Sequence, residues 1–209
     1  MKIIVIGATG SIGKLAVKTL LEEGQTVTAF ARHPENLKGG DGRLTRVAGD
    51  AADGQSVAPA IKGHDAVIVT LGAGAARTGT IRSTGTLNVI QAMQKHRVNR
   101  LIVQSTLGAH DSWGNLNFFW KRIMFGLLLR PVHRDHELQE SLVRASGLDW
   151  TIVRPSASSD RVRAGALHEG FAADQRGLRL QIARLDVARF LGRQLRETRY
   201  LRRAVAISY

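Results

Sequence analysis

Three glycines stand at a regular spacing near the start of the chain, in the run IGATGSIG over residues 6–13. Gly7, Gly10 and Gly13 follow an apolar stretch and precede a segment with helical periodicity. A glycine-rich turn between a strand and a helix exposes backbone amides, and the helix dipole favours an anion there. The spacing is G-x-x-G-x-x-G and not the commoner G-x-G-x-x-G. It therefore leaves two alternatives open, a pyrophosphate cradle or a bare tight turn.

Residues at the ends of the next apolar runs favour the cradle. Arg32 ends the run TVTAFAR, and arginine suits a 2′-phosphate on an adenosine ribose, whereas Asp or Glu would suit a bare 2′-hydroxyl. Asp50 ends the run LTRVAGD, where a carboxylate could accept a hydrogen bond from an adenine amino group. Leu71 and Gly72 end the fourth run, beside which a cofactor could pass closely. Together these residues predict a dinucleotide site with a preference for NADP(H).

The elements that must position these residues alternate along the chain. Alternating strands and helices are typical of a parallel sheet that is covered on both faces. We therefore predict an α/β fold, a doubly wound Rossmann-type parallel sheet with helices on both faces, in a single domain over residues 1–209. Residues 107–131 and 156–181 are expected to be substrate-side insertions, with 156–177 as loop, and Pro59 is expected to break or begin its helix. The predicted strands are 3–6, 26–32, 44–50, 65–72, 100–106, 149–155 and 204–208, and the predicted helices are 11–23, 33–37, 55–63, 83–96, 132–145 and 182–197.

Composition excludes several classes of function. The chain has no cysteine, which excludes disulfides, thiolate nucleophiles and cysteine metal sites. The net charge is +13, but no dense basic run appears, so no nucleic-acid partner is expected. The longest later apolar run, 123–129, is too short to span a membrane. The start of the chain does not have the pattern of a signal peptide, and a cytoplasmic location is expected. The run HRDHE at 133–137 is interpreted as a helix start, and no metal site is predicted.

With these residues in hand, the chain resembles the atypical short-chain dehydrogenase/reductases of the NAD(P)H-binding, NmrA-like group. Within that group it most resembles the biliverdin-IXβ reductase and flavin reductase type. The resemblance is carried by GATGSIG, ARHPENL, VAGDAAD, GHDAVIVTLG, GTLNVIQAMQKHRVNRLIVQST, DHELQESLVRASGLDWTIVRPS and LDVARFL. It implies an NADP(H) site formed by Gly7, Thr9, Gly10, Ser11, Ile12, Arg32, Asp50, Ala51, Leu71, Gly72, Pro155 and Ser156.

The resemblance also implies where catalysis would occur. Ser105 and Thr106 fall where the group places Ser or Thr near the nicotinamide, and His136 falls where flavin-reductase members carry a histidine. The wider superfamily uses a Tyr-x-x-x-Lys pair, in which the tyrosine protonates a carbonyl. The matching positions here are Val132 and His136, so neither member of the pair is present. Reduction of a simple ketone by that route is therefore not expected.

The chemistry that remains favours an acceptor that spreads charge. A flavin, quinone or tetrapyrrole can take hydride into a conjugated system and gain its proton from water or a weak donor. The first hypothesis is therefore an NADPH-dependent oxidoreductase that acts on such a flat acceptor. Thr106, Ser105, His133 and His136 are the candidate polar groups, with a histidine near its ordinary pKa of about 6.5 as a proton donor. The alternative hypothesis is a non-catalytic NADP(H)-binding redox sensor of the NmrA-like type.

An aromatic stretch follows the fifth predicted strand. The sequence WGNLNFFWKRIMFGLLL at 113–129 could form a lid or stacking wall for a flat acceptor. At helical spacing its aromatic residues could equally belong to the core or to a homodimer interface. A role at a membrane surface is a further interpretation of FFWKRIMFGLLLR. The sequence leaves these alternatives open.

Overall fold

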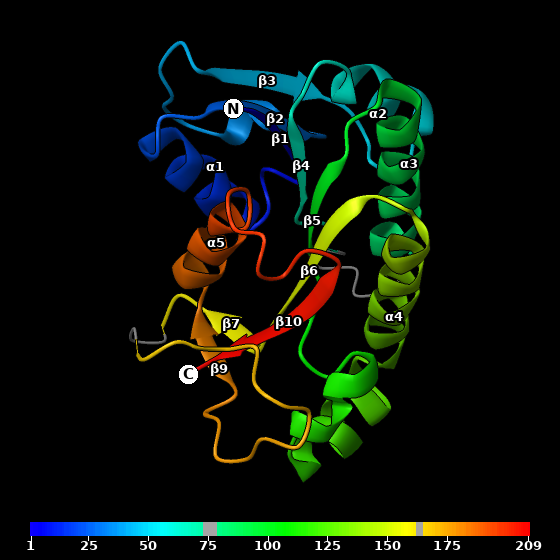
Figure 1. The fold of residues 1–209 in the computed structure, drawn as a ribbon, viewed down its shortest axis with the longest axis vertical. Helices are drawn as coiled ribbons and strands as arrows, with labels where there is room; N and C mark the ends of the chain where they lie inside the picture. Colours follow the sequence, from blue (N-terminus) through cyan, green and yellow to red (C-terminus); the bar gives the residue numbers. More distant parts are fainter. Residues whose placement is uncertain (73–78, 162–164) are drawn as a thin grey trace.

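Eight strands form one sheet in the order β3-β2-β1-β4-β5-β6-β10-β8, in a computed structural model that describes residues 1–72, 79–161 and 165–209 (Figure 1). The described pairs between neighbours from β3 to β10 are parallel, and β8 pairs with β10 in the antiparallel direction. The predicted doubly wound parallel sheet is confirmed. The strands are β1 (Lys2–Ile6), β2 (Thr26–Ala31), β3 (Leu44–Ala48), β4 (Ala66–Val69), β5 (Arg100–Gln104), β6 (Asp149–Pro155), β7 (Ala157–Ser159), β8 (His168–Glu169), β9 (Gln181–Ala183) and β10 (Arg203–Ser208).

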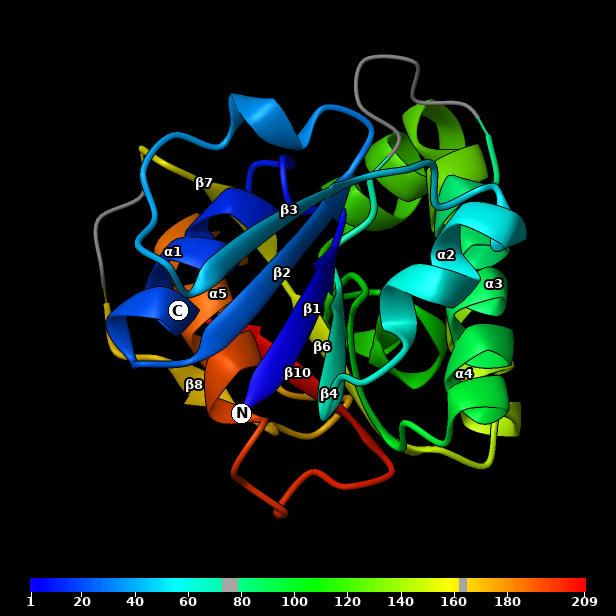
Figure 2. The ribbon, with the colours of Figure 1, turned by 90° about the horizontal axis from the view of Figure 1, so that it is seen from above.

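Helices cover both faces of this sheet (Figure 2). Helices α1 and α5 lie on one face, and α2, α3 and α4 lie on the other. This arrangement puts the carboxyl ends of the parallel strands at one open edge, where ligands bind in folds of this type. The helices are α1 (Gly13–Glu22), α2 (Gly54–Ile61), α3 (Ile81–His96), α4 (Arg130–Ala145) and α5 (Arg184–Arg193), with short 3-10 helices η1 (Pro34–Asn36) and η3 (His110–Asn115) and the π-helix η4 (Phe119–Leu128).

The first strand shows why the sheet is buried on both sides. Side chains alternate along a strand, so Ile3 and Val5 point to the face covered by α1 and α5, while Ile4 and Ile6 point to the opposite face. All four side chains are fully buried, each in the apolar cluster of its own face. A continuous run of β-branched residues is therefore stable in the centre of this sheet.

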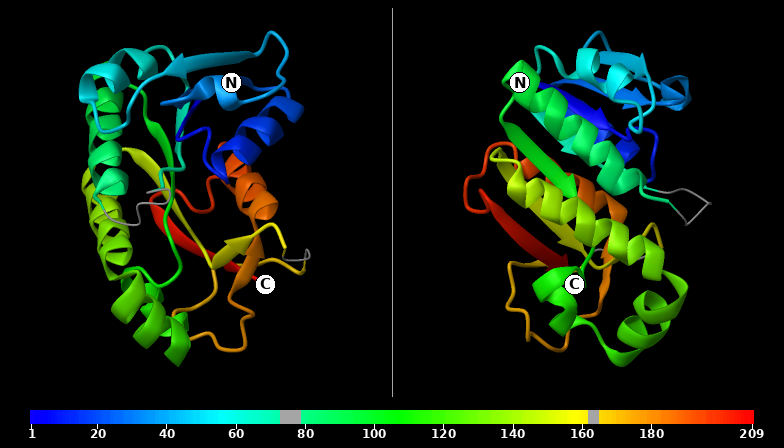
Figure 3. Two further views of the ribbon diagram at one scale, coloured as in Figure 1. Left: turned by 180° about the vertical axis from the view of Figure 1, so that it is seen from behind. Right: turned by 90° about the vertical axis from the view of Figure 1, so that its right-hand side faces the viewer.

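Helices α3 and α4 lie side by side on their face of the sheet (Figure 3). The carboxylate of Asp135 on α4 accepts hydrogen bonds from the backbone amides of Arg82 and Ser83, at 3.1 and 3.0 Å, and from the Ser83 hydroxyl at 2.6 Å. These amides belong to the first turn of α3, which has no intrahelical partner for them. A side chain of one helix therefore caps its neighbour and fixes where α3 begins.

The helices of the described ranges were also compared with the length and apolar character that a membrane span requires. None of them meets both requirements.

The structure corrects several predicted boundaries. Helix α1 begins at Gly13 and not at residue 11, so more of the glycine run is loop than predicted. Pro59 lies inside α2, which Asp53 caps by accepting a hydrogen bond from the amide of Gln55. The segment 156–177, expected to be loop, contains β7 and β8, and β7 pairs with β9 in a small second sheet. Part of the predicted insertion 156–181, residues 162–164, lies outside the described residues.

Candidate dinucleotide and acceptor site

The glycine loop is both a tight turn and a source of free amides. Gly7 has φ +83°, and a Cβ there would lie 2.9 Å from the carbonyl oxygen of Thr70, so the turn itself demands glycine. The described backbone hydrogen bonds of the loop include none from the amides of Ser11, Ile12 or Gly13, and no side chain caps α1. Unpartnered amides at a helix N-terminus are the groups that bind an anion. The loop is therefore a tight turn that also offers free amides to an anion, and its use as a pyrophosphate cradle stays a prediction.

A groove of about 570 Å³ runs along the carboxyl ends of the strands from β1 to β5. It crosses the point between β1 and β4 where the strand order changes direction, which is where doubly wound sheets bind nucleotides. Its volume is typical of a small-molecule site. The groove brings together the predicted cofactor residues that follow the first four strands: Gly7, Thr9, Gly10, Ser11, Ile12, Arg32, Asp50, Ala51, Leu71 and Gly72.

Arg32 and Asp50 end adjacent strands at the adenosine end predicted for this groove. Arg32 is exposed, and none of the ion pairs in the described part of the chain involves it. The nearest acid in sequence, Glu35, is instead paired with His33 at 3.1 Å. One carboxylate oxygen of Asp50 accepts a hydrogen bond from the amide of Ala52 at 2.9 Å. An arginine in this position, with no ion-pair partner among the described residues, is suited to a phosphate on the cofactor.

Arg82 also lines the groove, and the sequence interpretation missed it. Its side chain is only 12% exposed, and its Nε and Nη1 atoms make no hydrogen bond to any residue that the structure describes. Burial lowers the pKa of Arg82, and the attraction of Asp135, whose carboxylate lies 3.6 Å from Nη1, only partly opposes that shift. Buried donors without partners are costly unless a ligand satisfies them. Its position in the first turn of α3, the helix that follows the fourth strand, was the signal available in the sequence.

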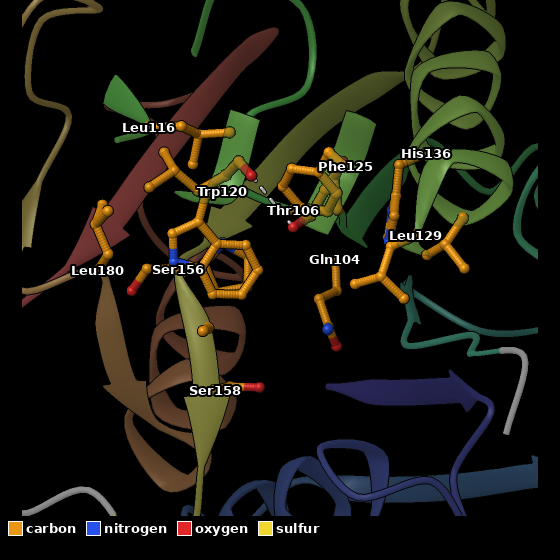
Figure 4. Close-up of a pocket in the computed structure, with 15 residues that line it drawn as sticks. Gln104, Thr106, Leu116, Trp120, Phe125, Leu129, His136, Ser156, Ser158 and Leu180 are labelled. Carbon is orange, nitrogen blue, oxygen red and sulfur yellow. Dashed lines mark hydrogen bonds between the residues drawn. The ribbon is translucent and has the colours of Figure 1, made fainter. Parts of the chain in front are cut away.

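A second cavity of about 180 Å³ adjoins the groove (Figure 4). The two cavities share Gln104, His136 and Ser158, so a ligand in one lies next to a ligand in the other. Pro155 and Ser156, predicted to contact the cofactor, line this second cavity and not the groove. The other lining residues are mostly apolar: Ser105, Thr106, Leu107, Leu116, Trp120, Phe125, Leu129, Val132, Ala157 and Leu180.

Ser105 is held in a buried ion-pair network. Its hydroxyl donates a hydrogen bond of 2.6 Å to Glu140, which is fully buried on α4. Arg154 of β6 contacts the same carboxylate through two hydrogen bonds, at 2.9 and 2.7 Å, and contacts Asp111 at 2.8 Å. Burial opposes the charge of Arg154, but these bonds raise its pKa above the ordinary value. The Ser105 hydroxyl uses its one donor on Glu140, so in this arrangement it can only accept a hydrogen bond from a ligand in the cavity, and its catalytic role stays a prediction.

Thr106 and the two positions of the missing catalytic pair face the second cavity. Thr106 is half-buried, and its hydroxyl makes one long hydrogen bond of 3.3 Å, to the carbonyl oxygen of Leu107. Val132 and His136, which match the superfamily's tyrosine and lysine, both line the cavity. The two positions that the sequence comparison matched to the tyrosine and the lysine therefore lie at the cavity wall, where this chain has an aliphatic and an imidazole side chain.

His136 is buried, and its expected ordinary pKa is wrong. Burial, reinforced by the charge of Arg82, lowers the pKa of His136 to about 3. The imidazole is therefore neutral at physiological pH and is not an acid that supplies a proton there. Its Nδ1 atom makes no hydrogen bond within the described part of the chain. His133 does not line the cavity: it donates a hydrogen bond of 2.9 Å to the carbonyl of Gly108.

The aromatic stretch divides between the cavity wall and the surface. Trp120 and Phe125 line the cavity with their ring centroids 5.6 Å apart. Trp113 packs against Phe125 and His133, whereas Phe118 and Phe119 are exposed. Residues that line the cavity and residues that form exposed apolar surface are thus different members of one segment, and whether either binds a ligand or a partner stays a prediction.

Further site residues came only from the structure. Gln104, the last residue of β5, lies between the two cavities, and Arg184 at the start of α5 lines the groove while it pairs with Asp160 at 2.5 Å. Gln104 was detectable as a polar residue that ends a buried strand. Arg184 comes from a distant segment, which strand-end reasoning does not examine. Within the described ranges no group of three or more His, Asp or Glu side chains is arranged to hold a metal ion.

Comparisons with known proteins agree with this geometry. A family pattern described as NAD(P)H-binding matches residues 7–198. A relative from Bacillus subtilis, described as an uncharacterized sugar epimerase, is 28% identical over 204 residues, which are 89% of this chain and 88% of the relative. A short-chain dehydrogenase/reductase from Veillonella parvula, solved in complex with NADP, superposes with a TM-score of 0.83 at 18% identity, over 100% of this chain and 94% of the other.

A second solved structure has a related architecture. ChuY from Escherichia coli O157:H7, described as an anaerobilin reductase, superposes with a TM-score of 0.81 at 24% identity. The superposition covers 100% of this chain and 97% of ChuY. At these identities the two structural likenesses show the Rossmann-type fold alone.

Proposed function

The chain belongs to the NAD(P)H-binding family, and we propose that it is an NADPH-dependent reductase that transfers hydride to a flat conjugated acceptor such as a flavin, quinone or tetrapyrrole. One observation carries the proposal. The dinucleotide groove and an apolar, aromatic-walled cavity meet at Gln104, His136 and Ser158. Such a junction would hold the reacting ring of a cofactor against the ring of an acceptor, and proximity of that kind supplies much of an enzyme's rate enhancement.

The groove fits NADPH by its donor groups. The amides of Ser11, Ile12 and Gly13 would bind the pyrophosphate, Arg32 would bind the 2′-phosphate, and Arg82 has two buried donors to satisfy. NADPH when bound supplies the hydride, and the protein supplies position and exclusion of water. The choice of NADPH over NADH rests on Arg32, because an Asp or Glu at the end of the second strand would be needed for a bare ribose.

The polar groups of the cavity favour an acceptor that needs little acid catalysis. His136 is neutral, the Ser105 hydroxyl is engaged by Glu140, and the Thr106 hydroxyl is a weak acid. None of these is a substitute for the absent tyrosine and lysine. A conjugated acceptor delocalises the charge that arrives with the hydride, so its proton can come from solvent or through Thr106. The same absence gives no support to sugar epimerisation, the activity named for the Bacillus relative.

The size of the cavity limits how the acceptor would enter. About 180 Å³ is below the 300–1,000 Å³ typical of sites for drug-sized ligands. The cavity therefore admits one ring of an acceptor, with Trp120 and Phe125 as stacking surfaces, while the remainder of the molecule lies outside. The ChuY neighbour, an anaerobilin reductase, supports an acceptor of the tetrapyrrole class.

The competing function is a redox sensor that binds NADP(H) without turnover. The absent Tyr/Lys pair favours it, because loss of the usual acid leaves cofactor binding intact. The aromatic cavity beside the groove favours the reductase, since a sensor has no need of an acceptor site.

The test is NADPH oxidation, followed at 340 nm with FMN, a short-chain quinone and biliverdin as acceptors. Sustained oxidation supports the reductase, and tight NADPH binding without turnover on any acceptor supports the sensor. Val132→Phe would fill the cavity without touching the groove, so it should reduce turnover while NADPH affinity is unchanged. Leu138→Phe, at an exposed position of the same helix, is the matched control and should leave both unchanged. If the two variants had equal turnover, the cavity would not be the acceptor site.

A further inference from the structure

Helix η4 and the residue before it carry an apolar surface that no described part of the chain covers. Phe118 and Leu127 are 74% and 73% exposed, which is unusual for large apolar side chains in a folded domain. Three neighbours, Phe119, Ile123 and Leu128, are also exposed. We call these five residues the η4 face. Exposed apolar side chains that gather on one helix are typical of interaction sites, whereas single exposed apolar residues are common on any surface.

Cations, without acids, accompany the η4 face. The chain has no Asp or Glu between Asp111 and Asp135, whereas Lys121, Arg122 and Arg130 lie within that span. These three residues line one surface hollow between η4 and the start of α4. Arg176, from the loop before β9, lines an adjacent hollow with Phe118 and Lys121. The apolar face is therefore bordered by positive charge from two segments of the chain, a combination that is complementary to an apolar layer beneath anionic groups.

The position of η4 in the molecule leaves this face accessible. The segment lies at one end of the molecule, below α4 and beside the loop that precedes β9 in the view of Figure 1. The Asn115 side chain fixes it there by donating a hydrogen bond of 2.8 Å to the carbonyl of Ala172. The same helix walls the acceptor cavity with Trp120 and Phe125, so its two sides face different environments.

We propose that the η4 face docks on the surface of an anionic lipid bilayer, with Phe118 and Leu127 inserted among the lipids and Lys121, Arg122 and Arg130 at the headgroups. Through this contact an apolar acceptor that is dissolved in the bilayer reaches the cavity behind η4. The route of the acceptor rests on the proposed function, whereas the docking does not. A second copy of the chain is the less favourable occupant, because it would bring the same cations face to face.

Vesicle co-sedimentation of the full chain tests the docking without NADPH or turnover. We expect the protein to bind vesicles of phosphatidylcholine with about 30% phosphatidylglycerol, and to bind pure phosphatidylcholine at least about tenfold more weakly, because each cation near the surface is attracted by the anionic headgroups. High salt should reduce the difference, since screening shortens the reach of the charges.

Two pairs of variants assign the binding to the η4 face. Phe118→Asp with Leu127→Asp should weaken binding to the anionic vesicles by about tenfold or more, whereas Leu138→Asp, exposed on α4, should not. Lys121→Glu with Arg122→Glu should weaken it similarly, whereas Arg196→Glu, exposed after α5, should cause a smaller loss. Neither Phe118 nor Leu127 lines the groove or the acceptor cavity, so NADPH oxidation with a soluble acceptor should be retained.

The outcomes separate this inference from the proposed function. Failure to bind the anionic vesicles, or binding that the η4 variants do not weaken, overturns the docking even if soluble acceptors are reduced. Vesicle binding without NADPH turnover upholds the docking and leaves only the acceptor route without support. A concentration-dependent dimer in analytical ultracentrifugation that is abolished by Leu127→Asp, together with no vesicle binding, would assign the face to self-association instead.

Discussion

Arg32 is the residue on which the choice of cofactor depends. It is exposed at the end of β2, lines the groove and has no ion-pair partner among the described side chains. Arg32→Ala should lower the affinity for NADPH by about 10- to 100-fold, which is the usual contribution of a charge-assisted contact. The affinity for NADH should be nearly unchanged. Isothermal titration calorimetry with both cofactors measures this. Arg196→Ala is the control, and equal loss of NADPH and NADH would contradict the role given to Arg32.

His136 makes a prediction about pH. Its pKa is about 3 in the folded protein, mainly because of burial, against about 6.5 when exposed. Between these values the unfolded chain binds a proton that the folded chain does not, so stability should fall as pH is lowered through this window. The slope from this one group is about 1.4 kcal/mol per pH unit.

Urea unfolding from pH 7 to pH 4 measures that slope. His136→Gln removes the group and should flatten the dependence, whereas His168→Gln, an exposed position, should not. His64 contributes a slope of the same sign in both proteins, because burial also lowers its pKa. If His136→Gln and the wild type lose stability in parallel, His136 is not the buried neutral group described here. A neutral His136 also has a consequence for turnover. If kcat changes with pH near 6.5, the change should be the same in His136→Gln as in the wild type.

At the scale of elements, the buried ion pair joins β6 to α4. Arg154→Leu leaves the Glu140 carboxylate buried without its two charged hydrogen bonds, so the free energy of unfolding should fall by about 3–5 kcal/mol. Glu140→Leu combined with Arg154→Leu should recover most of that loss, because two apolar side chains can pack where the pair was. Chemical denaturation measures both.

The exposed end of the same network provides the control. Asp111→Asn removes only the contact between Arg154 and a carboxylate whose side chain is 71% exposed, so the cost should be about 1 kcal/mol or less. A large loss of unfolding free energy in Asp111→Asn, or no recovery of unfolding free energy in the Glu140→Leu and Arg154→Leu double variant, would show that the network stabilises the fold in another way.

Elements differed in how far periodicity predicted them. Strands such as β1 and β5 were recognisable because a two-residue alternation, or a run of β-branched residues, requires burial on one or both faces. The same alternation, applied to Leu101, Val103 and Ser105, would have placed the Ser105 hydroxyl on the face covered by α4, where Glu140 lies. The π-helix η4 was not predictable, since its hydrogen-bond spacing has no distinct signature in side-chain pattern.

At the scale of the whole molecule, cofactor binding should stabilise the folded chain. A ligand that binds only the folded state adds about 2.7 kcal/mol at 100 times its Kd, which is about 5–10 °C in Tm for a domain of this size. Differential scanning calorimetry with and without NADPH measures the shift. The Arg32→Ala variant should show a smaller increase in Tm than the wild type at the same NADPH concentration. A well-folded protein that shows no shift, and no heat with either NADPH or NADP⁺, would contradict the dinucleotide site altogether.

The sequence by itself determined the alternation of strands and helices, and with it the edge at which Gly7, Arg32, Asp50 and Gly72 meet. Those features are local, because strand ends, glycine turns and helix starts depend on neighbours in the chain. Tertiary structure alone decided the rest. It gave His136 its lowered pKa, engaged Ser105 with Glu140, and brought Arg82 and Arg184 into the groove. Burial and long-range hydrogen bonds set these properties, and they arise only when segments far apart in the sequence come into contact.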